Sequence, residues 1–271
     1  PAVALSLDHA GRDHAAASAR SVGPDPSPPG RVESCVTSTR VLRRMRSYLF
    51  LPSTMFALAL LGPLSPGHAQ AIERADALHQ EGRAADALAL LDSIVETEGP
   101  GPEVSWRAAR TAVNLGMLAE EGEEAKSWFL RAEAYADARI AVDPEDARAW
   151  EWLGVARGRR TLTEGLRTRA TLVNGVREAS LKALALDSTL SGAHHVLAMW
   201  HAEIRRLNTF ERLGAGALGA DDFGEASWDA AVDHLERAVA LAPEALVHRL
   251  ELARVYEDLD RRGDAITQLR T

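Results

Sequence analysis

A spacing of large and small side chains that recurs along the chain limits most strongly what it can fold into. In its clearest copy, Trp150, Leu153 and Gly154 follow an Asp-Pro turn at Asp143-Pro144. When two helices pack closely, small residues let the backbones approach and large residues fill the space between them. One helix pair per repeat of about 34 residues cannot bury its apolar face alone, so successive pairs must stack. The spacing therefore predicts a stack of helix pairs.

The same spacing continues on both sides of this copy and gives five units, of which the first is the weakest. The matching positions are filled by Ala75, Leu78, Gly82, Ala87 and Leu91 in unit one, by Trp106 in unit two, by Leu197, Ala198, Ala231, Leu235, Ala238 and Pro243 in unit four, and by Leu252, Ala253, Tyr256, Ala265 and Leu269 in unit five. These positions are those of the tetratricopeptide repeat. The chain is therefore predicted to be all-α, a tetratricopeptide-like α-solenoid of about five antiparallel helix pairs, with a generic helical bundle as the alternative.

Units two, three and four are longer than the repeat requires. Units two and three each carry about ten extra residues, and unit four has a longer insertion between Ala198 and Ala231. We expect lengthened helices and a long loop. The stretch Gly214–Gly219 looks like a phosphate-binding loop, but no predicted strand precedes it. We therefore interpret it as a flexible insertion between helices.

Several segments beyond the repeat positions resemble a known family. These segments are Ser105–Arg110, Glu164–Arg169, His194–Ile204, Asn208–Arg212 and Ala226–Ala231, followed by the turn at Pro243. From about Val104 to Arg270 the chain resembles the regulator of microtubule dynamics family of tetratricopeptide-like proteins, which includes bacterial members. It departs from the family pattern at Ala198, where Gly is more frequent, and at Ser188, where Pro is usual. The resemblance implies a helical adaptor, and the microtubule role of the eukaryotic relatives is not carried over to this chain.

An export signal is predicted ahead of the repeats. Arg43–Arg46 supplies a positive start, Tyr48–Gly62 an apolar core, and Gly67–Ala71 the small residues of a cleavage site. The core is short against the ~20 residues that a membrane-spanning helix needs. We therefore expect cleavage after Ala69 or Ala71, with a periplasmic or secreted product that has no stable membrane span. An uncleaved signal that anchors the chain in the membrane is the alternative.

The signal divides the chain into three segments. Residues 1–44 precede a good start at Met45 and are expected to be a non-native or disordered upstream segment. Residues 45–71 form the signal peptide, and residues 72–271 form the repeat domain. Because Thr271 falls within a predicted helix, we expect the natural chain to continue beyond it.

Composition excludes two classes of function. The formal net charge is −8, and a protein that binds nucleic acid nonspecifically needs a basic surface to displace counterions, so no nucleic-acid partner is predicted. The single cysteine, Cys35, lies ahead of the predicted mature domain, which excludes disulfide and thiol chemistry there. No cofactor is predicted.

A cluster of histidines raises the possibility of a metal or ligand site. His194, His195 and His201 share one predicted helix with Glu203. His194 and His201 lie two turns apart on one face, too far apart to share an ion without a second helix. No His-Glu-x-x-His spacing accompanies them. We therefore favour a structural or partner-binding role and predict no metal ligand and no catalytic residue.

The repeat register also predicts a partner-binding groove. Certain positions of the first helix in each unit line the concave face of tetratricopeptide arrays. They correspond here to Asp76, His79 and Gln80 in unit one, Arg107, Thr111 and Asn114 in unit two, Arg148, Glu151 and Arg159 in unit three, His195, Met199 and Glu203 in unit four, and Arg254, Glu257 and Asp258 in unit five. This mixed-charge surface would suit an extended peptide held by charge-assisted hydrogen bonds.

A run of arginines in unit three offers a second candidate site. It comprises Arg157, Arg159, Arg160, Arg167 and Arg169, followed by Arg177. The run fits a solvated helix face with partners such as Glu164, and equally an anion site, because guanidinium groups match the geometry of carboxylates and phosphates. Arg167 and Arg169 fall in the segment that resembles the family, and we mark them as a possible anion site.

These observations together predict an exported adaptor that binds a protein or peptide in its groove and has no catalysis of its own. Two alternatives stay open. One is a structural module that assembles with copies of itself. The other is a ligand-binding or metal-binding protein that uses the helix from His194 to Glu203.

Overall fold

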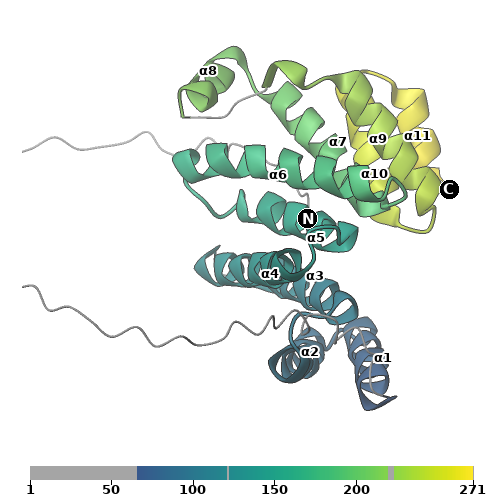
Figure 1. Cartoon of the computed structure of the whole chain (residues 1–271). Helices are drawn as coiled ribbons and strands as arrows, with labels where there is room; N and C mark the ends of the chain where they lie inside the picture. The colour runs from purple at the N-terminus through teal and green to yellow at the C-terminus, as the bar shows by residue number, and fades with distance from the viewer. Residues whose placement is uncertain (1–65, 121, 219–222, 271) are drawn as a thin grey trace, which may run out of the picture. The chain divides into compact units, whose positions relative to one another are not determined.

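A computed structural model describes residues 66–120, 122–218 and 223–270 of the chain, and this part is helical with no strand. The helices are α1 (Pro66–Gln80), α2 (Ala84–Glu98), α3 (Pro102–Leu118), α4 (Gly122–Val142), α5 (Ala147–Arg160), α6 (Leu166–Leu186), α7 (Ser191–Arg206), α8 (Thr209–Ala217), the short 3₁₀ helix η1 (Phe223–Glu225), α9 (Trp228–Leu241), α10 (Leu246–Asp258) and α11 (Arg262–Arg270). Figure 1 shows their order along the chain.

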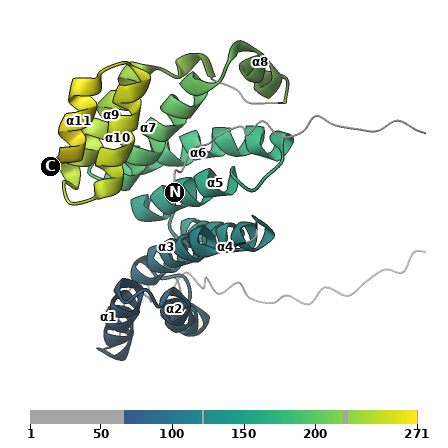
Figure 2. The ribbon, with the colours of Figure 1, turned by 180° about the vertical axis from the view of Figure 1, so that it is seen from behind.

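Five helix pairs follow one another in the described residues. The pairs are α1/α2, α3/α4, α5/α6, α7/α9 and α10/α11, and each second helix also packs against the first helix of the next pair. The first helices form a row of their own, in which α3 contacts α1 and α5, and α5 contacts α7. Both views show this stacking (Figures 1 and 2). The predicted α-solenoid of five helix pairs is therefore confirmed.

Small residues at the helix contacts explain the close packing. At Gly116 of α3, a Cβ atom would lie 2.5 Å from the ring of Phe129 on α4, so the two helices can approach this closely only if no side chain is present. Gly154 of α5 faces Ala179 and the buried Ser180 of α6, where a Cβ atom would lie 3.2 Å from the hydroxyl oxygen. Small residues at these contacts, among them Gly154 of the repeat spacing, therefore set the distance between helices.

Side-chain caps mark where several helices begin. The Asp146 carboxylate accepts a hydrogen bond from the amide of Ala149 at the start of α5, and the Ser227 hydroxyl accepts one from the amide of Ala230 at the start of α9. These bonds satisfy amides that have no partner within their own helix. Cap residues therefore fix the register at which each of these helices starts.

The insertions take two forms. Helices α4 and α6 are each 21 residues long, which confirms the lengthened helices expected in units two and three. The interpretation of Gly214–Gly219 as flexible is wrong for its described part, because Gly214 and Gly216 lie inside α8. A reciprocal cap explains the helix: Asn208 accepts from the amide of Glu211, whose carboxylate accepts from the amide of Asn208. This capping box offsets the cost of about 1 kcal/mol that each glycine adds to a helix.

The predicted signal region lies mostly outside the described residues. Residues 1–65 and Thr271 are not described, so the predictions for residues 1–44 and for most of 45–71 stay predictions. Helix α1 begins at Pro66 and therefore includes the end of the predicted signal peptide. Ile72 is the first residue after the expected cleavage site at Ala71, and it is buried in the core. No helix in the described part of the chain is long and apolar enough to cross a membrane.

Candidate partner-binding face

The first helices of four of the pairs carry eleven of the fifteen residues predicted to line the groove. We call this set of side chains the inner face. Its members are Arg107, Thr111 and Asn114 on α3, Arg148, Glu151 and Arg159 on α5, His195, Met199 and Glu203 on α7, and Arg254 and Glu257 on α10. Side chains of this set that contact a neighbouring first helix include Arg107, Thr111, Arg148, Glu151 and His195, so the inner face is also where consecutive repeats are joined.

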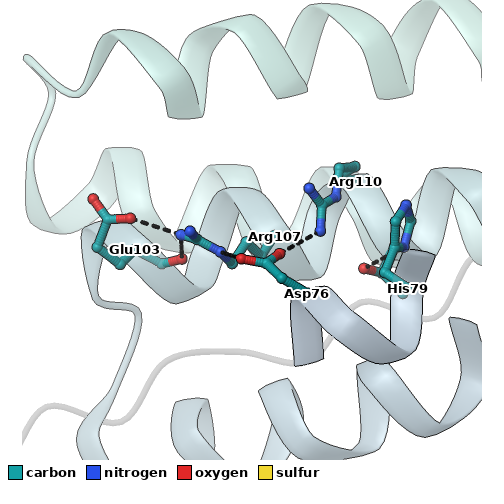
Figure 3. A network of polar contacts seen from close by, with 6 residues as sticks. Asp76, His79, Glu103, Arg107 and Arg110 are labelled. Atoms are coloured by element: carbon teal, nitrogen blue, oxygen red, sulfur yellow. Dashed lines mark hydrogen bonds and ion pairs between the residues drawn. The ribbon is translucent and has the colours of Figure 1, made fainter. Parts of the chain in front are cut away.

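At the N-terminal end, a carboxylate of α1 joins two arginines of α3. Asp76 accepts a hydrogen bond from Arg107 Nε at 2.8 Å and one from Arg110 Nη2 at 2.7 Å (Figure 3). Arg107 also reaches Glu103 on its own helix at 2.6 Å. Partial burial alone would raise the pKa of Asp76, but the hydrogen bonds and charges of the two guanidinium groups lower it overall. The charge of Arg107 is therefore already matched inside the fold.

The next residues of α3 are held in the same junction. Thr111 is fully buried, and its hydroxyl lies 3.4 Å from Nδ1 of His79 on α1. Burial and the nearby Arg110 lower the pKa of His79, so its ring stays neutral at neutral pH. Thr111 therefore joins helices and has no surface to offer a partner, whereas Asn114, one turn further on, is only half-buried.

Three arginines surround one indole where α3 meets α5. The guanidinium carbons of Arg107 and Arg148 lie 4.2 and 4.9 Å from the ring centroid of Trp106, and that of Arg110 lies at 5.1 Å. Cations are attracted to the face of an indole ring. The exposed Arg148 is therefore steadied by an aromatic surface while its hydrogen-bond donors stay accessible.

Glu151 joins α5 to the start of α7. Its Oε1 atom accepts a hydrogen bond from the amide of Ala193 at 3.1 Å, in the first turn of α7, a helix whose own N-cap residue makes no side-chain cap. A Cβ atom on Gly192 would overlap the same oxygen, so the carboxylate needs glycine there. Burial raises the pKa of Glu151 to about 7, although Arg148 and the backbone amides of Ala193 and Gly192 oppose this shift. Glu151 is thus a cap supplied by the preceding repeat.

Paired histidines join the helices at the C-terminal end. Nδ1 of His195 on α7 lies 3.1 Å from Nδ1 of His248 on α10, and Nδ1 of His194 lies 2.8 Å from Nδ1 of His234 on α9. Each pair can form one hydrogen bond if one ring donates and the other accepts. Burial, with His248 and Arg159 nearby, lowers the pKa of His195 to about 3. In the described residues, no group of three or more His, Cys, Asp or Glu side chains could hold a metal ion.

Two carboxylates near these histidines are held by arginines. Arg206 of α7 contacts Glu203 on its own helix and donates to Asp258 of α10 at 2.6 Å. Glu251 of α10 accepts from Arg254 at 2.5 Å, while its second oxygen, Oε2, is buried without a hydrogen-bond partner in the structure. Burial raises the pKa of both Glu203 and Glu251, and the neighbouring arginines oppose this shift.

Two arginines of the inner face have no such partner. Within the described residues, neither Arg148 nor Arg159 forms a hydrogen bond or an ion pair through its side chain. Arg159 is half-buried, and burial lowers its pKa, with Glu251 as the charge that partly compensates. An arginine that is partly removed from water without a matching carboxylate is costly. These two side chains are therefore the available cations of the inner face.

The remaining arginines of unit three are not members of the inner face. Arg160 pairs with Glu133 of α4 at 3.0 Å and approaches Glu164 at 3.6 Å, which supports the expected partner role of Glu164. Of the possible anion site, Arg169 donates to the backbone carbonyl of Glu164 at 3.2 Å and Arg167 is exposed. The structure shows no contact between Arg167 and Arg169, so the anion site stays a prediction.

Sequence reasoning missed several residues that hold the inner face together. Arg110, Arg206, His248 and Glu251 occupy none of the positions that the register assigned to the groove. Two of their contacts span 52 and 53 residues, Arg206 to Asp258 and His248 to His195. A spacing rule within one helix gives no signal for such pairs, because they depend on how far neighbouring first helices are offset along their axes.

The stacked helix pairs and the inner face define a tetratricopeptide-like helical repeat protein. The structure is similar to the crystal structure of a thermophilic TPR protein of Thermus thermophilus, with a TM-score of 0.54 and 18% sequence identity over 74% of this chain and 87% of that one. At this identity the likeness shows the fold.

The family follows from the sequence comparison. The profile described as regulator of microtubule dynamics protein 1-3 matches residues 71–271, and the chain belongs to this family, which confirms the predicted resemblance. Regulator of microtubule dynamics protein 3 of Bos taurus is 26% identical over 197 residues, which are 72% of this chain and 42% of the relative. Protein 1 of Bos taurus is 23% identical over 175 residues, 64% of this chain and 54% of the relative. The chain thus spans about half the length of these relatives or less.

Proposed function

We propose that this chain is an exported adaptor that holds a segment of another protein along its inner face and has no catalysis of its own. The helical repeat architecture supports this proposal, because stacked repeats present extended surfaces to other proteins. The observation that carries it is the row of polar side chains that runs from α3 to α10. Among the described residues, this row includes two cations, Arg148 and Arg159, whose side chains form no hydrogen bond or ion pair.

The chemistry of the inner face favours binding over catalysis. The buried carboxylates of the inner face and beside it already have fixed contacts: Glu151 caps α7, and Glu203 and the neighbouring Glu251 are bound by arginines of their own helices. A general base has to reach a substrate proton, and a nucleophile needs an adjacent base. Side chains committed to joining helices are poorly placed for either task.

Blocking the inner face with bulk would test the adaptor role. Asn114→Trp and Glu257→Trp place a large side chain at a half-buried and an exposed position of the inner face. Lys182→Trp, on the exposed side of α6, is the matched control. The full chain and each variant would serve as bait for an envelope extract, with circular dichroism to check helicity.

We expect one or more proteins to be captured by the full chain and by Lys182→Trp, and to be lost from both inner-face variants. Equal capture by all three variants would mean that partners bind elsewhere. Capture of no specific protein by the unaltered chain would count against the adaptor role itself.

The exported location rests on the predicted signal at 45–71. N-terminal sequencing of the chain isolated from cells expressing it tests this part of the proposal. A mature N-terminus after Ala69 or Ala71 supports export, and recovery of the product in the periplasmic or secreted fraction should accompany it. A product that begins upstream of Met45 would contradict the proposed domain organisation.

A second candidate function is self-assembly, favoured by one observation at α11. Ile266 and Leu269 are exposed beside a cavity of about 340 Å³, which is also lined by Glu257, Asp260 and Arg262. Exposed apolar residues around a hollow are a feature of association sites. Sedimentation equilibrium of the full chain and of Ile266→Glu separates the two functions. A dimer that Ile266→Glu dissociates would favour self-assembly, and a monomer at all concentrations would exclude it.

A further inference from the structure

We propose that the inner face recognises an acidic segment of its partner, and that Arg148 and Arg159 each bind one carboxylate of that segment. This inference rests on the proposed adaptor function and adds the chemistry of the partner. The two arginines lie on one helix, α5, at its first and last turns. A segment with two suitably spaced Asp or Glu side chains could therefore bridge them.

The helix geometry places both guanidinium groups on one side of α5. Arg148 and Arg159 are eleven residues apart, which is close to three full turns of an α-helix. Their Cα atoms are therefore about 16 Å apart along the helix axis and point in nearly the same direction. An extended peptide covers this distance in about five residues, at about 3.3 Å per residue. Because successive side chains of an extended peptide point to opposite sides, two carboxylates that face the same side are expected about four or six residues apart.

The contrast with the neighbouring arginines makes these two residues stand out. Arg107 and Arg110 share Asp76, and Arg206 and Arg254 are bound to carboxylates of α7 and α10. Those ion pairs are complete within the fold. In the described residues, the side chains of Arg148 and Arg159 lack such a partner. A ligand carboxylate can therefore bind them without breaking a contact between helices.

Both side chains are prepared for a carboxylate in different ways. Arg148 is stacked on Trp106, which restricts its motion and leaves the donor edge of the guanidinium group in solvent. Arg159 is half-buried, and burial of the cation lowers its pKa. Glu251 compensates this charge only in part and forms no ion pair with Arg159. A bound carboxylate could accept two parallel hydrogen bonds from the guanidinium group. Because side chains that are already restricted lose less conformational entropy on binding, more of the interaction energy contributes to affinity.

The surroundings restrict the acidic residues of the bound segment to the part of the inner face beside Arg148 and Arg159. Toward α10 lie Glu251, Glu257 and Asp258, which would repel further carboxylates. The whole chain carries a net charge of −8, so an acidic peptide gains nothing from nonspecific attraction. Glu251 Oε2, a buried acceptor without a hydrogen-bond partner in the structure, could receive a backbone N–H of the bound segment.

A selection from random peptides tests the inference without knowledge of the natural partner. The full chain would be immobilised and used to enrich a phage-displayed library of random, unphosphorylated peptides. We expect the enriched peptides to share two acidic residues about four or six positions apart. Binding of one synthetic peptide would then be measured by fluorescence anisotropy for the full chain and for Arg148→Glu, Arg159→Glu and Lys182→Glu. The last variant is the control, since Lys182 is exposed on α6 and belongs neither to the inner face nor to the possible anion site.

We expect Arg148→Glu and Arg159→Glu each to weaken binding of the acidic peptide by at least about tenfold, and Lys182→Glu to leave it unchanged. A peptide in which one Glu is replaced by Lys should regain affinity for one of the two variants. Such a rescue cannot come from a variant that has merely lost its fold.

The remaining outcomes separate the two proposals. Enriched neutral or basic peptides that Asn114→Trp blocks would overturn the acidic segment and leave the adaptor function standing. Acidic peptides that bind all three charge variants equally would overturn the role of Arg148 and Arg159. Failure to enrich any peptide would count against peptide binding by the inner face, and both proposals would fall together.

Discussion

The junction of α1 with α3 and the junctions of α7 with α9 and α10 both link helices through polar side chains. The first uses charged groups, and the others use neutral ones. At the N-terminal end, Asp76 joins the helices in its ionised form, because two arginines lower its pKa. At the C-terminal end, His194 with His234, and His195 with His248, join the helices in neutral form. Repeats of one architecture can therefore differ in how each junction responds to solution conditions.

The contrast has a direct physical basis. An ion pair between Asp and Arg persists as long as the carboxylate stays deprotonated. Two imidazole rings that share one hydrogen bond need at least one lone pair between them, so adding a proton to both breaks the bond. Acid is thus expected to act on the C-terminal junctions well before it acts on Asp76.

The largest effect is expected from removing the N-terminal carboxylate. Asp76→Ala would leave two half-buried guanidinium groups without their shared partner, at a cost of about 2–3 kcal/mol in unfolding free energy. Urea denaturation followed by circular dichroism measures it. Asp86→Ala removes an exposed carboxylate paired with Arg83 and should cost less than about 1 kcal/mol. Equal losses in the two variants would mean that the α1–α3 junction contributes nothing beyond a surface pair.

The C-terminal junction should reveal itself through its pH dependence. The folded pKa of His195, about 3, is below the unfolded value of 6.5, so its contribution is present above pH 6.5 and is lost as the pH falls toward 3. His195→Gln removes this dependence. Between pH 7 and pH 5, the unaltered chain should lose about 2 kcal/mol relative to the variant.

Comparing the two chains at each pH cancels the opposite trend of the buried carboxyl groups Glu203 and Glu251, whose pKa values are raised. Stability would again be measured by urea denaturation. A difference between the unaltered chain and His195→Gln that is the same at pH 7 and pH 5 would show that His195 is not held neutral.

A smaller effect is expected at Glu151, which lies on α5, between the N-terminal and C-terminal junctions. Its folded pKa, about 7, is above its usual value of 4.5, so ionisation costs stability as the pH rises through 7. Glu151→Gln keeps an oxygen acceptor for the amide of Ala193 and cannot ionise. We expect the variant to gain about 1 kcal/mol relative to the unaltered chain between pH 6 and pH 8. Thermal unfolding at both pH values would measure this, and a variant that loses stability at pH 8 would contradict it.

The smallest effect is expected on α8, which lies outside both junctions. Phe210 is 85% exposed, so Phe210→Ser should change the unfolding free energy by less than about 0.5 kcal/mol. Hydrogen exchange monitored by mass spectrometry should show unchanged protection in α3 and α7. A change in either helix would show that the insertion is coupled to the junctions.

A feature of the structure could be predicted from the sequence when it depends on residues that are close together in the chain. Trp150, Leu153 and Gly154 report packing between consecutive helices, and that local pattern predicted the five helix pairs. The helix α8 was missed although its signal is also local: Asn208 and Glu211 have the spacing of a capping box. The glycines of that segment were given more weight than its cap.

The inner face was predicted only in part, because its contacts are not local. The register placed the predicted residues on the correct helices, yet it could not show that Arg107 is bound by Asp76 or that Thr111 is fully buried. Those facts depend on the offset between neighbouring first helices. The same offset leaves Arg148 and Arg159 without a hydrogen bond or ion pair among the described residues, which no spacing within α5 could reveal.

The cap on α7 has a consequence for how these repeats can be exchanged. The first turn of α7 has no capping side chain of its own and depends on Glu151, which lies 42 residues earlier in the chain. The side chain that caps the first helix of the fourth repeat therefore belongs to the third repeat. Moving unit four alone into another array would remove this cap, whereas moving units three and four together would keep it. The natural building block at this position is two repeats long.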